Sequence, residues 1–266
     1  MKARTHRANP EERRERILRD LKLHAAIRVS HLAKSLGVTT ETIRRDLDAL
    51  GESGILNRTY GGAALPPGQR EPAMHERQHT QVDERSRIGT HAAALIPPGS
   101  IVMIDAGSTT LHFARQLASQ AEKLTAITNC LGVATTLGVN GSIRVVLCPG
   151  DYVQQEGGVF GLHTTDFLRR FNADFAVIGA SGLDLQGPTE ASSDAVGVKQ
   201  AMMEMARRRI LLVDSGKFGT AHLERVGPLD ALSDVVTERP PRSDLVQALR
   251  AAGVKLHIAA RAKRRA

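Results

Sequence analysis

The pattern of apolar residues changes near residue 62, and this change constrains the fold more than any other feature of the sequence. Before it the 266-residue chain shows short helical patterns, and from about residue 84 strand-like apolar runs alternate with helical ones. Residues 63–82 contain prolines, glycines and mixed charge, which is typical of a linker. The sequence therefore predicts a first domain at 1–62, a linker at 63–82, a second domain at 83–258 and a tail at 259–266.

The charge is divided in the same way. The chain carries 36 Lys and Arg against 28 Asp and Glu. Residues 1–62 hold 13 basic against 8 acidic residues, residues 63–260 have a net charge of −1, and residues 261–266 add four cations. A basic first domain indicates an anionic partner such as nucleic acid. Only 3% of the residues are aromatic, which disfavours recognition of single strands by base stacking.

Several other classes of protein are disfavoured. No apolar run reaches the roughly 20 residues that a membrane span needs, and the sequence does not open with a recognisable signal peptide. The two cysteines, Cys130 and Cys148, make no disulfide framework. We expect a cytoplasmic protein that uses no membrane, no metal and no cofactor.

The order of elements in the first domain is that of a winged helix-turn-helix. Asn9 and Glu12 fit a capping box at the start of a first helix. Ser30 fits the cap of a second helix, which Gly37 ends. A third helix, TTETIRRDLDAL, follows a short turn, and residues 55–62 predict a hairpin, or wing.

The third helix has one apolar side and one polar side. Ile43, Leu47 and Leu50, at i, i+4 and i+7, form an apolar stripe. Arginine can pair with guanine or phosphate, and threonine can reach base edges or phosphates. By itself the helix could also be a solvated one whose arginines pair with Asp48, but the ordered set of helices, turn and wing favours duplex DNA. The residues predicted to contact DNA are Thr39, Thr40, Thr42, Arg44, Arg45, Arg58 and Tyr60.

The second domain predicts a mostly parallel α/β fold. Continuous apolar strands separated by helices indicate a sheet that is covered on both faces. Helices are expected at 163–171 and 194–208, among others, which places Arg207–Arg209 at a helix end. The expected strands are at 100–105, 124–128, 142–150, 174–180, 209–214, 234–237 and 254–258.

Polar and glycine-rich segments follow the carboxyl ends of several expected strands, where ligands bind in open α/β sheets. In the first of them Gly107 permits a tight turn, and Ser108, Thr109 and Thr110 offer hydroxyls and backbone N–H groups at a helix N-terminus, which suits a phosphate. Neither a Walker loop nor a dinucleotide fingerprint is present. The residues predicted to bind or orient an effector are Asp105, Gly107, Ser108, Thr109, Thr110, Asn129, Gly150, Ser181, Asp184, Lys199 and Lys217.

The run LAKSLGVTTETIRRDLDALGESGILNRTYGGA resembles the DNA-binding domain of the DeoR-type sugar-operon regulators, with Tyr60 where these proteins more often carry histidine. The resemblance continues through the second domain, where the family usually has Glu-Ala and this chain has Asp194-Ala195. It implies a sensor domain that looks like ribose-5-phosphate isomerase. The motifs that carry it in the second domain, in the family's order, lie at 105–110, 128–129, 149–150, 179–184, 198–202 and 214–218.

The resemblance implies a repressor of a carbohydrate or polyol catabolic operon, controlled by a phosphorylated sugar or polyol. One recognition helix reads few base pairs, so we expect a homo-oligomer, a dimer or tetramer, on double-stranded operator DNA. An activator or dual regulator would use the same parts.

An isomerase-like enzyme is a third alternative. It needs a carboxylate base beside the carbonyl carbon of the sugar. The candidate bases are Asp105, Asp184, Glu190 and Asp194, with Lys199 or Lys217 as helper. The isomerases carry an acidic pair in a run that corresponds to Val177–Gly182, which here contains no acid. We therefore expect a binding pocket without enzymatic activity.

Overall fold

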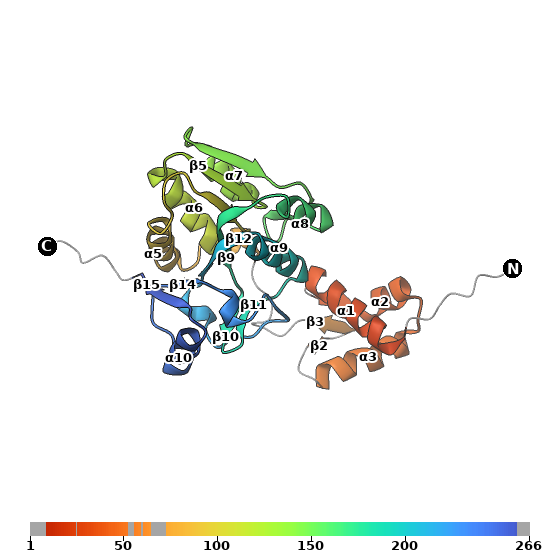
Figure 1. The fold of residues 1–266 in the computed structure, drawn as a ribbon. Coiled ribbons are helices and arrows are strands. Elements are labelled where there is room, and N and C mark those ends of the chain that lie inside the picture. The colour runs from red at the N-terminus through yellow and green to blue at the C-terminus, as the bar shows by residue number, and fades with distance from the viewer. Residues whose placement is uncertain (1–8, 25, 53–55, 60, 65–72, 260–266) are drawn as a thin grey trace. The chain divides into compact units, whose positions relative to one another are not determined.

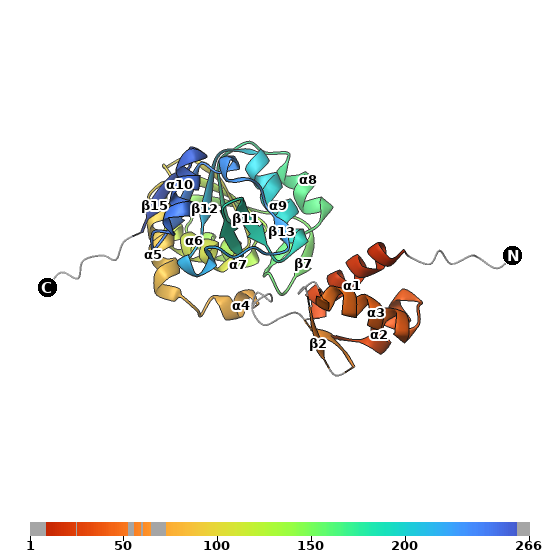
Figure 2. The same ribbon diagram turned by 90° about the horizontal axis from the view of Figure 1, so that it is seen from below.

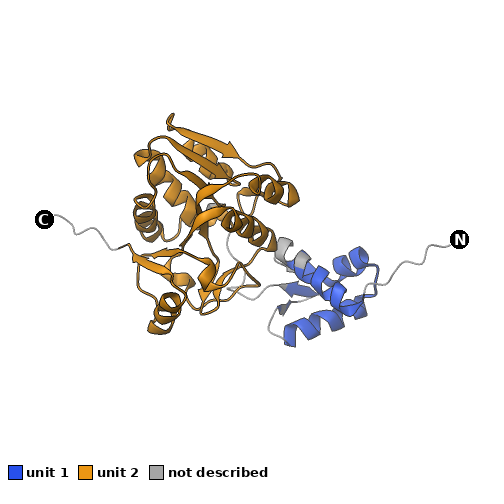
Figure 3. Ribbon diagram, viewed as in Figure 1, with its two compact units in different colours: residues 1–71 blue, residues 72–266 orange. Residues whose placement is uncertain are grey.

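The computed structural model describes residues 9–24, 26–52, 56–59, 61–64 and 73–259. The chain forms two compact units, Met1–Glu71 and Pro72–Ala266 (Figure 3), which we call the head and the body. Their boundary falls inside the interval predicted as a linker. Of the tail predicted at 259–266, only Ala259 belongs to the described residues.

The described part of the head contains three helices and a small antiparallel sheet of order β1-β3-β2 (Figure 1). This confirms the predicted helix-turn-helix with a wing. The elements are α1 (Pro10–His24), β1 (Ala26–Arg28), α2 (Val29–Leu36), α3 (Thr40–Glu52), β2 (Asn57–Thr59) and β3 (Gly62–Ala64).

Side-chain caps set the start of two of these helices. Glu12 N donates to Asn9 Oδ1 at 2.9 Å and Asn9 N donates to Glu12 Oε2 at 3.2 Å, so the predicted capping box is confirmed. Thr39 caps α3, because its Oγ1 accepts a hydrogen bond from Thr42 N at 3.2 Å. The cap predicted at Ser30 is wrong: β1 leads directly into α2 at Val29, so Ser30 lies inside the helix.

The wing is a three-stranded sheet because β1, which the sequence pattern did not predict, pairs with β3. Gly62 pairs with Arg28 at this junction, and a Cβ at Gly62 would lie 2.1 Å from Ile27 O. Only glycine allows the two strands to approach this closely. Ala63, at the start of the predicted linker, is fully buried in the head.

A buried ion pair joins α1 to α3 beside the apolar core of the head. Ile17, Leu32, Ile43 and Leu47 are completely buried there. Asp46 lies on α3 next to them, and it accepts hydrogen bonds from Arg13 Nε at 2.5 Å and Arg13 Nη2 at 3.1 Å. Both side chains are at most 10% exposed, so the pair fixes the helix that supports α3.

The described part of the body is built on a seven-stranded parallel sheet of order β15-β14-β12-β9-β4-β5-β6. Figure 2 shows α5, α6 and α7 along one face and α8, α9 and α10 along the other. This confirms the predicted α/β fold. The strands are β4 (Ile101–Ile104), β5 (Leu124–Thr128), β6 (Ile143–Leu147), β9 (Ala173–Gly179), β12 (Ala206–Leu212), β14 (Asp234–Thr237) and β15 (Lys255–Ile258).

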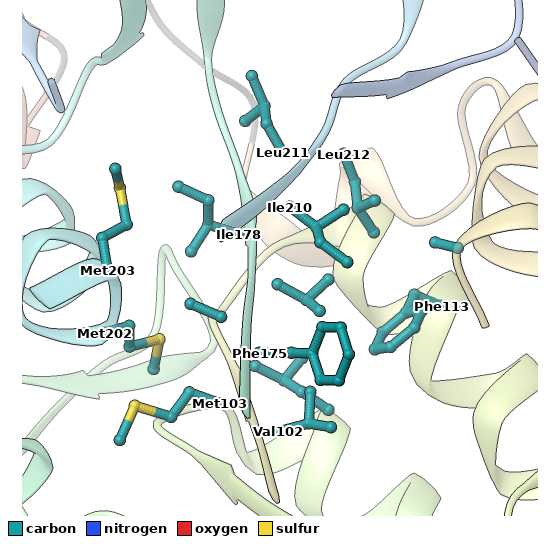
Figure 4. Close-up of a cluster of buried hydrophobic side chains, with 14 of the residues drawn as sticks. Val102, Met103, Phe113, Phe175, Ile178, Met202, Met203, Ile210, Leu211 and Leu212 are labelled. Carbon is teal, nitrogen blue, oxygen red and sulfur yellow. The ribbon is translucent and has the colours of Figure 1, made fainter. Parts of the chain in front are cut away.

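The helices cover the sheet with apolar side chains. Figure 4 shows Phe113 of α6 on one side of β9 and Met202 and Met203 of α9 on the other. All three are at most 7% exposed. The helices are α4 (Met74–Arg77), α5 (Val82–Ala93), α6 (Ser108–Gln120), α7 (Leu131–Leu137), α8 (Leu162–Leu168), α9 (Ser193–Glu204) and α10 (Ser243–Ala251), with the short 3-10 turns η1 (Ser215–Lys217) and η2 (Leu229–Ala231).

The order of the sheet reverses between β4 and β9. From β4 the chain proceeds outward to β5 and β6, and it then returns to β9 and proceeds in the opposite direction to β12, β14 and β15. In open α/β sheets the crevice outside the carboxyl ends of the strands at such a switch point is where ligands bind. The fold therefore directs attention to the ends of β4 and β9.

Two smaller antiparallel units stand beside the main sheet, and the sequence pattern did not predict either. The hairpin of β7 (Asp151–Val153) and β8 (Gly158–Phe160) follows β6. The second unit has the order β10-β11-β13, with β10 (Gly182–Asp184), β11 (Gly187–Glu190) and β13 (Glu224–Arg225). Their strands are two to four residues long, too short for an alternating pattern to stand out.

The expected helix over 194–208 ends earlier, at Glu204, and Arg207–Arg209 lie in β12 instead. The prediction of a helix end for these arginines is wrong. Arg208 pairs with Asp234 of the neighbouring strand β14, with Nε 2.6 Å from Oδ2. No proline or glycine separates helix from strand here, so no residue type marks the boundary in the sequence.

The last part of the predicted linker belongs to the body. Met74 is 3% exposed and packs in the core of the body, and α4 and the start of α5 lie within 63–82. None of the helices that the structure describes is long and apolar enough to cross a membrane.

The buried pair in the head leads to a stability prediction. Asp46→Ala removes the Asp46 carboxylate from the buried Arg13 guanidinium. This should lower the free energy of unfolding of the head by about 3–5 kcal/mol. Hydrogen exchange measured on peptides of α1 and α3 in the full chain should accelerate accordingly. Glu41→Ala on the exposed side of α3 is the control, with an expected cost of about 1 kcal/mol or less. Equal exchange in the two variants would contradict the role of the pair.

Candidate functional site

The polar side of α3 is open to solvent along its arginines. Ile43, Leu47 and Leu50 are buried against the head core, as predicted. On the other side the side chains of Arg44 and Arg45 are 57% and 80% exposed. An exposed row of arginines on a helix with a buried back is the arrangement that enters a major groove.

Among the residues that the structure describes, the arginines of α3 pair with one weak partner. Glu41, itself 60% exposed, lies 3.7 Å from Arg44 Nη1 and 3.5 Å from Arg45 Nε. Exposed pairs of this kind contribute about 0–1 kcal/mol. Phosphates or guanines can therefore replace Glu41 as the partner of both guanidinium groups at little cost in free energy. The alternative pairing with Asp48 is not found for either arginine.

The threonines at the start of α3 surround its N-terminus. Thr39 and Thr40 are exposed and Thr42 is half-buried. The hydroxyls of Thr39 and Thr42 lie 2.9 Å apart, within hydrogen-bond distance of each other. Exposed hydroxyls at a helix N-terminus suit a DNA phosphate.

The wing arginine is tied to the third helix. Arg58 Nε lies 3.0 Å from Asp48 Oδ1, and Arg58 Nη1 donates to Gly62 O at 3.2 Å. Arg58 is thus both exposed and part of the contact between α3 and the wing. Tyr60, the other predicted wing contact, lies outside the described residues.

In the body, a polar pocket opens at the switch point between β4 and β9. Its lining comes from the loop after β4 and the start of α6, the ends of β9 and β11, α9, η1, α4 and the β7–β8 turn. Residues far apart in the sequence therefore meet at one edge of the sheet. The lining residues are Arg77, Ala106, Gly107, Ser108, Thr109, Glu156, Gly179, Ala180, Glu190, Ala195, Lys199 and Lys217.

The floor of the pocket is a buried ionic network. Lys199 Nζ forms a close ion pair with Asp105 and lies 3.2 Å from Glu190 Oε1. Gly179 N donates to Asp105 Oδ2 at 3.1 Å, and Ser181 Oγ donates to Glu190 Oε2 at 2.6 Å. Burial alone would lower the pKa of Lys199, but the two carboxylates outweigh it and raise that pKa above its usual value. Lys199 is therefore a fixed cation.

One side of the pocket is the N-terminus of α6. Within the described part of the chain, the hydroxyls of Ser108 and Thr109 make no hydrogen bond, whereas Thr110 Oγ1 donates to Asp105 O and to Gly107 O, both at 2.9 Å. Ser108 and Thr109 can therefore donate to a ligand, while Thr110 holds the turn. Gly107 is extended, with φ −174°, so its backbone conformation does not require glycine, but a Cβ there would lie 3.0 Å from Thr110 Oγ1.

Two further cations line the pocket. Lys217 of η1 donates from Nζ to Ala180 O at 2.6 Å. Arg77 of α4 pairs with Glu156 of the β7–β8 turn, with Nη2 2.9 Å from Oε2. Hydroxyls, helix N–H groups and cations thus face one small space, which is the chemistry that recognises a phosphate.

Comparison with known proteins identifies the family to which this chain belongs. Residues 13–68 match the DeoR-like helix-turn-helix domain and residues 80–239 match the DeoR C terminal sensor domain. The chain belongs to the DeoR family of transcriptional regulators.

Relatives within the DeoR family match over nearly the whole chain. The glycerol-3-phosphate regulon repressor of Escherichia coli (strain K12) is 34% identical over 93% of this chain and 98% of its own length. The HTH-type transcriptional repressor GlcR of Bacillus subtilis (strain 168) is 32% identical over 93% of this chain and 96% of its own. These relatives are named as repressors and not as enzymes, which confirms the prediction of a DNA-binding regulator over that of an isomerase.

Likeness to solved structures is more distant. Ribose 5 phosphate isomerase A from Neisseria gonorrhoeae aligns with 54% of this chain and 56% of its own, with 18% identity and a TM-score of 0.39. A likeness of this degree has no bearing on function.

Six of the eleven residues predicted to bind or orient an effector in this DeoR-family chain do not line its pocket, and three of these six, Asn129, Gly150 and Asp184, have structural roles in loops. Asp184 lies in the β10–β11 turn, where it pairs with Arg225 Nη1 at 2.8 Å, and this hydrogen bond lowers the pKa of its carboxyl. Gly150, with φ 148°, leaves room for Thr164, whose Oγ1 would lie 2.1 Å from a Cβ there. Asn129 is completely buried, and its Nδ2 donates to Val159 O at 3.0 Å. Each of them shapes a loop near the sheet edge.

Two further predicted residues act from beneath the pocket. Asp105 and Ser181 are buried and hold Lys199 and Glu190 in place, as described above. Of the predicted set, Gly107, Ser108, Thr109, Lys199 and Lys217 reach the lining.

The prediction from sequence missed Arg77 and Glu156 and considered Glu190 only as a catalytic base. Arg77 falls in the interval interpreted as a linker, and Glu156 in a turn between two unpredicted short strands. Neither stands in a motif, so only the three-dimensional arrangement brings them to the pocket. One feature of the sequence could have indicated that the end of the predicted linker is folded: the apolar Met74 lies one helical turn before Arg77.

The exposed arginines of α3 give a prediction for DNA binding. Arg45→Ala should weaken binding to the cognate operator by about 1–3 kcal/mol if Arg45 reads a base, with a smaller loss on unrelated duplexes. Fluorescence anisotropy on an operator selected from a random duplex pool measures both. Arg16→Ala removes an exposed arginine of α1 and gives the baseline for loss of charge. Operator affinity equal to that baseline would remove Arg45 from the interface.

Proposed function

We propose that this DeoR-family chain represses a carbohydrate or polyol catabolic operon, and that a phosphorylated sugar or polyol releases it from the operator. The proposal is supported by relatives that are named as repressors, among them two repressors of glycerol-3-phosphate regulons at 34% and 31% identity. It is also supported by the separation of a basic head from a body that carries a polar pocket.

One observation carries the proposed effector class. The pocket at the β4–β9 switch point combines two hydroxyls that make no hydrogen bond among the described residues, Ser108 and Thr109, with the N-terminus of a 13-residue helix and the Lys217 ammonium. A phosphate satisfies all three: it accepts from hydroxyls and backbone N–H groups and pairs with the cation. The buried carboxylate Glu190 then remains to accept hydrogen bonds from sugar or polyol hydroxyls.

On the DNA side, the proposal assigns operator recognition to residues 1–62 and effector sensing to residues 83–258, with residues 63–82 connecting them. Thr39, Thr40, Thr42, Arg44, Arg45 and Arg58, together with Tyr60, form the proposed DNA contacts. Because one recognition helix covers only a few base pairs, a dimer or tetramer on repeated half-sites supplies the specificity. Light scattering coupled to gel filtration measures the size of this oligomer.

Glycerol 3-phosphate is the first compound to test, given the relatives named above. A thermal-shift panel of phosphorylated sugars and polyols, each paired with its unphosphorylated form, should give a rise in melting temperature only with phosphorylated members, since a ligand that binds the native state stabilises it. The stabilising compound should also release labelled operator. Equal shifts with glycerol and with glycerol 3-phosphate would contradict the phosphate assignment.

Thr109→Val tests the phosphate site directly. The variant loses a hydroxyl that makes no hydrogen bond within the described part of the body, so its stability should change little. A hydrogen bond to a charged group contributes about 1.5–3 kcal/mol, so the affinity for the stabilising compound should fall about ten- to hundredfold. Thr135→Val, which removes a hydroxyl of α7 bonded to Leu131 O, is the matched control. An unchanged response in Thr109→Val would reject this site.

A further inference from the structure

The first described residues of the body, 73–81, follow the head in the chain and form part of the wall of the pocket. Arg77 of α4 lines the pocket, and it pairs there with Glu156. The pair is largely buried, with side-chain exposures of 9% and 17%. Through Arg77, this segment of the body is in direct contact with the space assigned to the effector.

One set of bonds attaches this segment to the β7–β8 turn. Met74 N donates to Gln155 O at 2.8 Å, and the Arg77–Glu156 pair lies one turn of helix further along. Met74 itself is buried in the body core. The position of α4 thus depends both on the body core and on the turn that carries Glu156.

A second set of bonds attaches the segment to the loop that carries Lys217. Arg85 donates from Nη1 to Arg77 O and to Thr80 O, the latter at 3.1 Å, and it pairs with Asp214 at 3.3 Å. Asp214 precedes η1, and its carbonyl accepts from Lys217 N at 3.1 Å. Two attachments of the segment therefore run through loops whose side chains line the pocket, in addition to the packing of Met74 in the body core.

The pocket in this state has little room and little net charge. Its free space is about 20 Å³, enough for about one water molecule. Arg77, Lys199 and Lys217 face Glu156 and Glu190 in the lining, and Asp105 beneath them balances the remaining positive charge. A phosphorylated compound needs both more space and less negative charge.

The part of the pocket that can give way is the Arg77–Glu156 pair. Asp105, Lys199 and Glu190 are 1–7% exposed and bonded to one another and to the ends of β9 and β11, so their displacement would disrupt the sheet edge. Glu156 lies on a short turn and repels a phosphate. Departure of Glu156 would add one unit of positive charge to the pocket and open space beside Arg77.

We propose, resting on the function proposed above, that Arg77 is the residue through which the effector acts on the head. The effector phosphate replaces Glu156 as the partner of Arg77. The β7–β8 turn then moves away with Glu156, and its bond to Met74 N loosens. Residues 73–81 are held by the turn in the DNA-binding state and by the effector in the released state, which gives the effector the differential affinity that regulation requires.

Two single variants and one double variant test this proposal, with glycerol 3-phosphate as the probe and operator anisotropy as the readout. Arg77→Gln should lower the affinity for the probe about tenfold or more and abolish release of operator by the probe. Glu156→Gln removes the competing carboxylate, so the probe should bind several times more tightly. Without the probe, Glu156→Gln should bind operator more weakly than the wild type, because the bond that holds residues 73–81 is weakened.

The double variant Arg77→Glu with Glu156→Arg separates a structural role from the proposed one. Reversal of the pair should restore most of the operator affinity that Glu156→Gln loses, but release by the probe should stay abolished, because the cation no longer belongs to residues 73–81. Arg169→Gln, which breaks the exposed pair with Glu204 at 3.3 Å, is the matched control and should behave as wild type. Circular dichroism melting checks that each variant is folded.

The outcomes distinguish this proposal from the proposed function. If the wild type releases operator on addition of probe and Arg77→Gln or the double variant does so equally well, the role of Arg77 is overturned and the proposed function stands. If the wild type responds to no phosphorylated compound, the proposed effector class fails. In that case the operator affinity of Glu156→Gln without probe still decides: an affinity equal to that of the wild type overturns the coupling through Arg77.

Discussion

The interaction on which the body depends is the contact of Asp105 with Gly179 N and Lys199. Asp105 follows β4, Gly179 ends β9, and Lys199 lies on α9, so one carboxylate joins the two central strands to the helix that covers them. A buried lysine without partners would lose its proton or destabilise the fold. Here Asp105 and Glu190 keep it charged, and in return it holds two carboxylates together at the switch point of the sheet.

This arrangement divides the pocket into a fixed floor and a changeable wall. The floor is buried and bonded to the ends of the strands, whereas the wall comes from the β7–β8 turn, η1 and the segment after the head. Interiors are close-packed and tolerate discrete rearrangements better than gradual deformation. A signal from the pocket is therefore more readily transmitted through the wall than through the sheet, and the wall includes Arg77.

Much of the fold could be predicted from the sequence because strong local patterns encode it. The apolar stripe of α3 and the continuous apolar strands of the body repeat over many residues, and Ser108, Thr109 and Lys217 follow strands whose ends meet at one sheet edge. Asp184 was misleading for the opposite reason: an acid after a strand looks like a ligand, but a local turn and an arginine 41 residues away satisfy it. Arg77 could not be placed, because its role depends on tertiary contacts with turns that have no pattern.

The net charge of the body shows why the lysines alone do not account for the proposed recognition of a phosphate. Residues 63–260 carry a net charge of −1, so the body as a whole does not attract a phosphate. Lys199 is already compensated by Asp105 and Glu190 and cannot supply the missing attraction. What remains is local: the N–H groups and hydroxyls at the start of α6, the Lys217 ammonium and the Arg77 guanidinium. Since the Glu156 carboxylate pairs with Arg77, the positive charge of the pocket depends on whether Glu156 is in place, and in the proposed mechanism recognition of the phosphate and release of the operator are therefore one event.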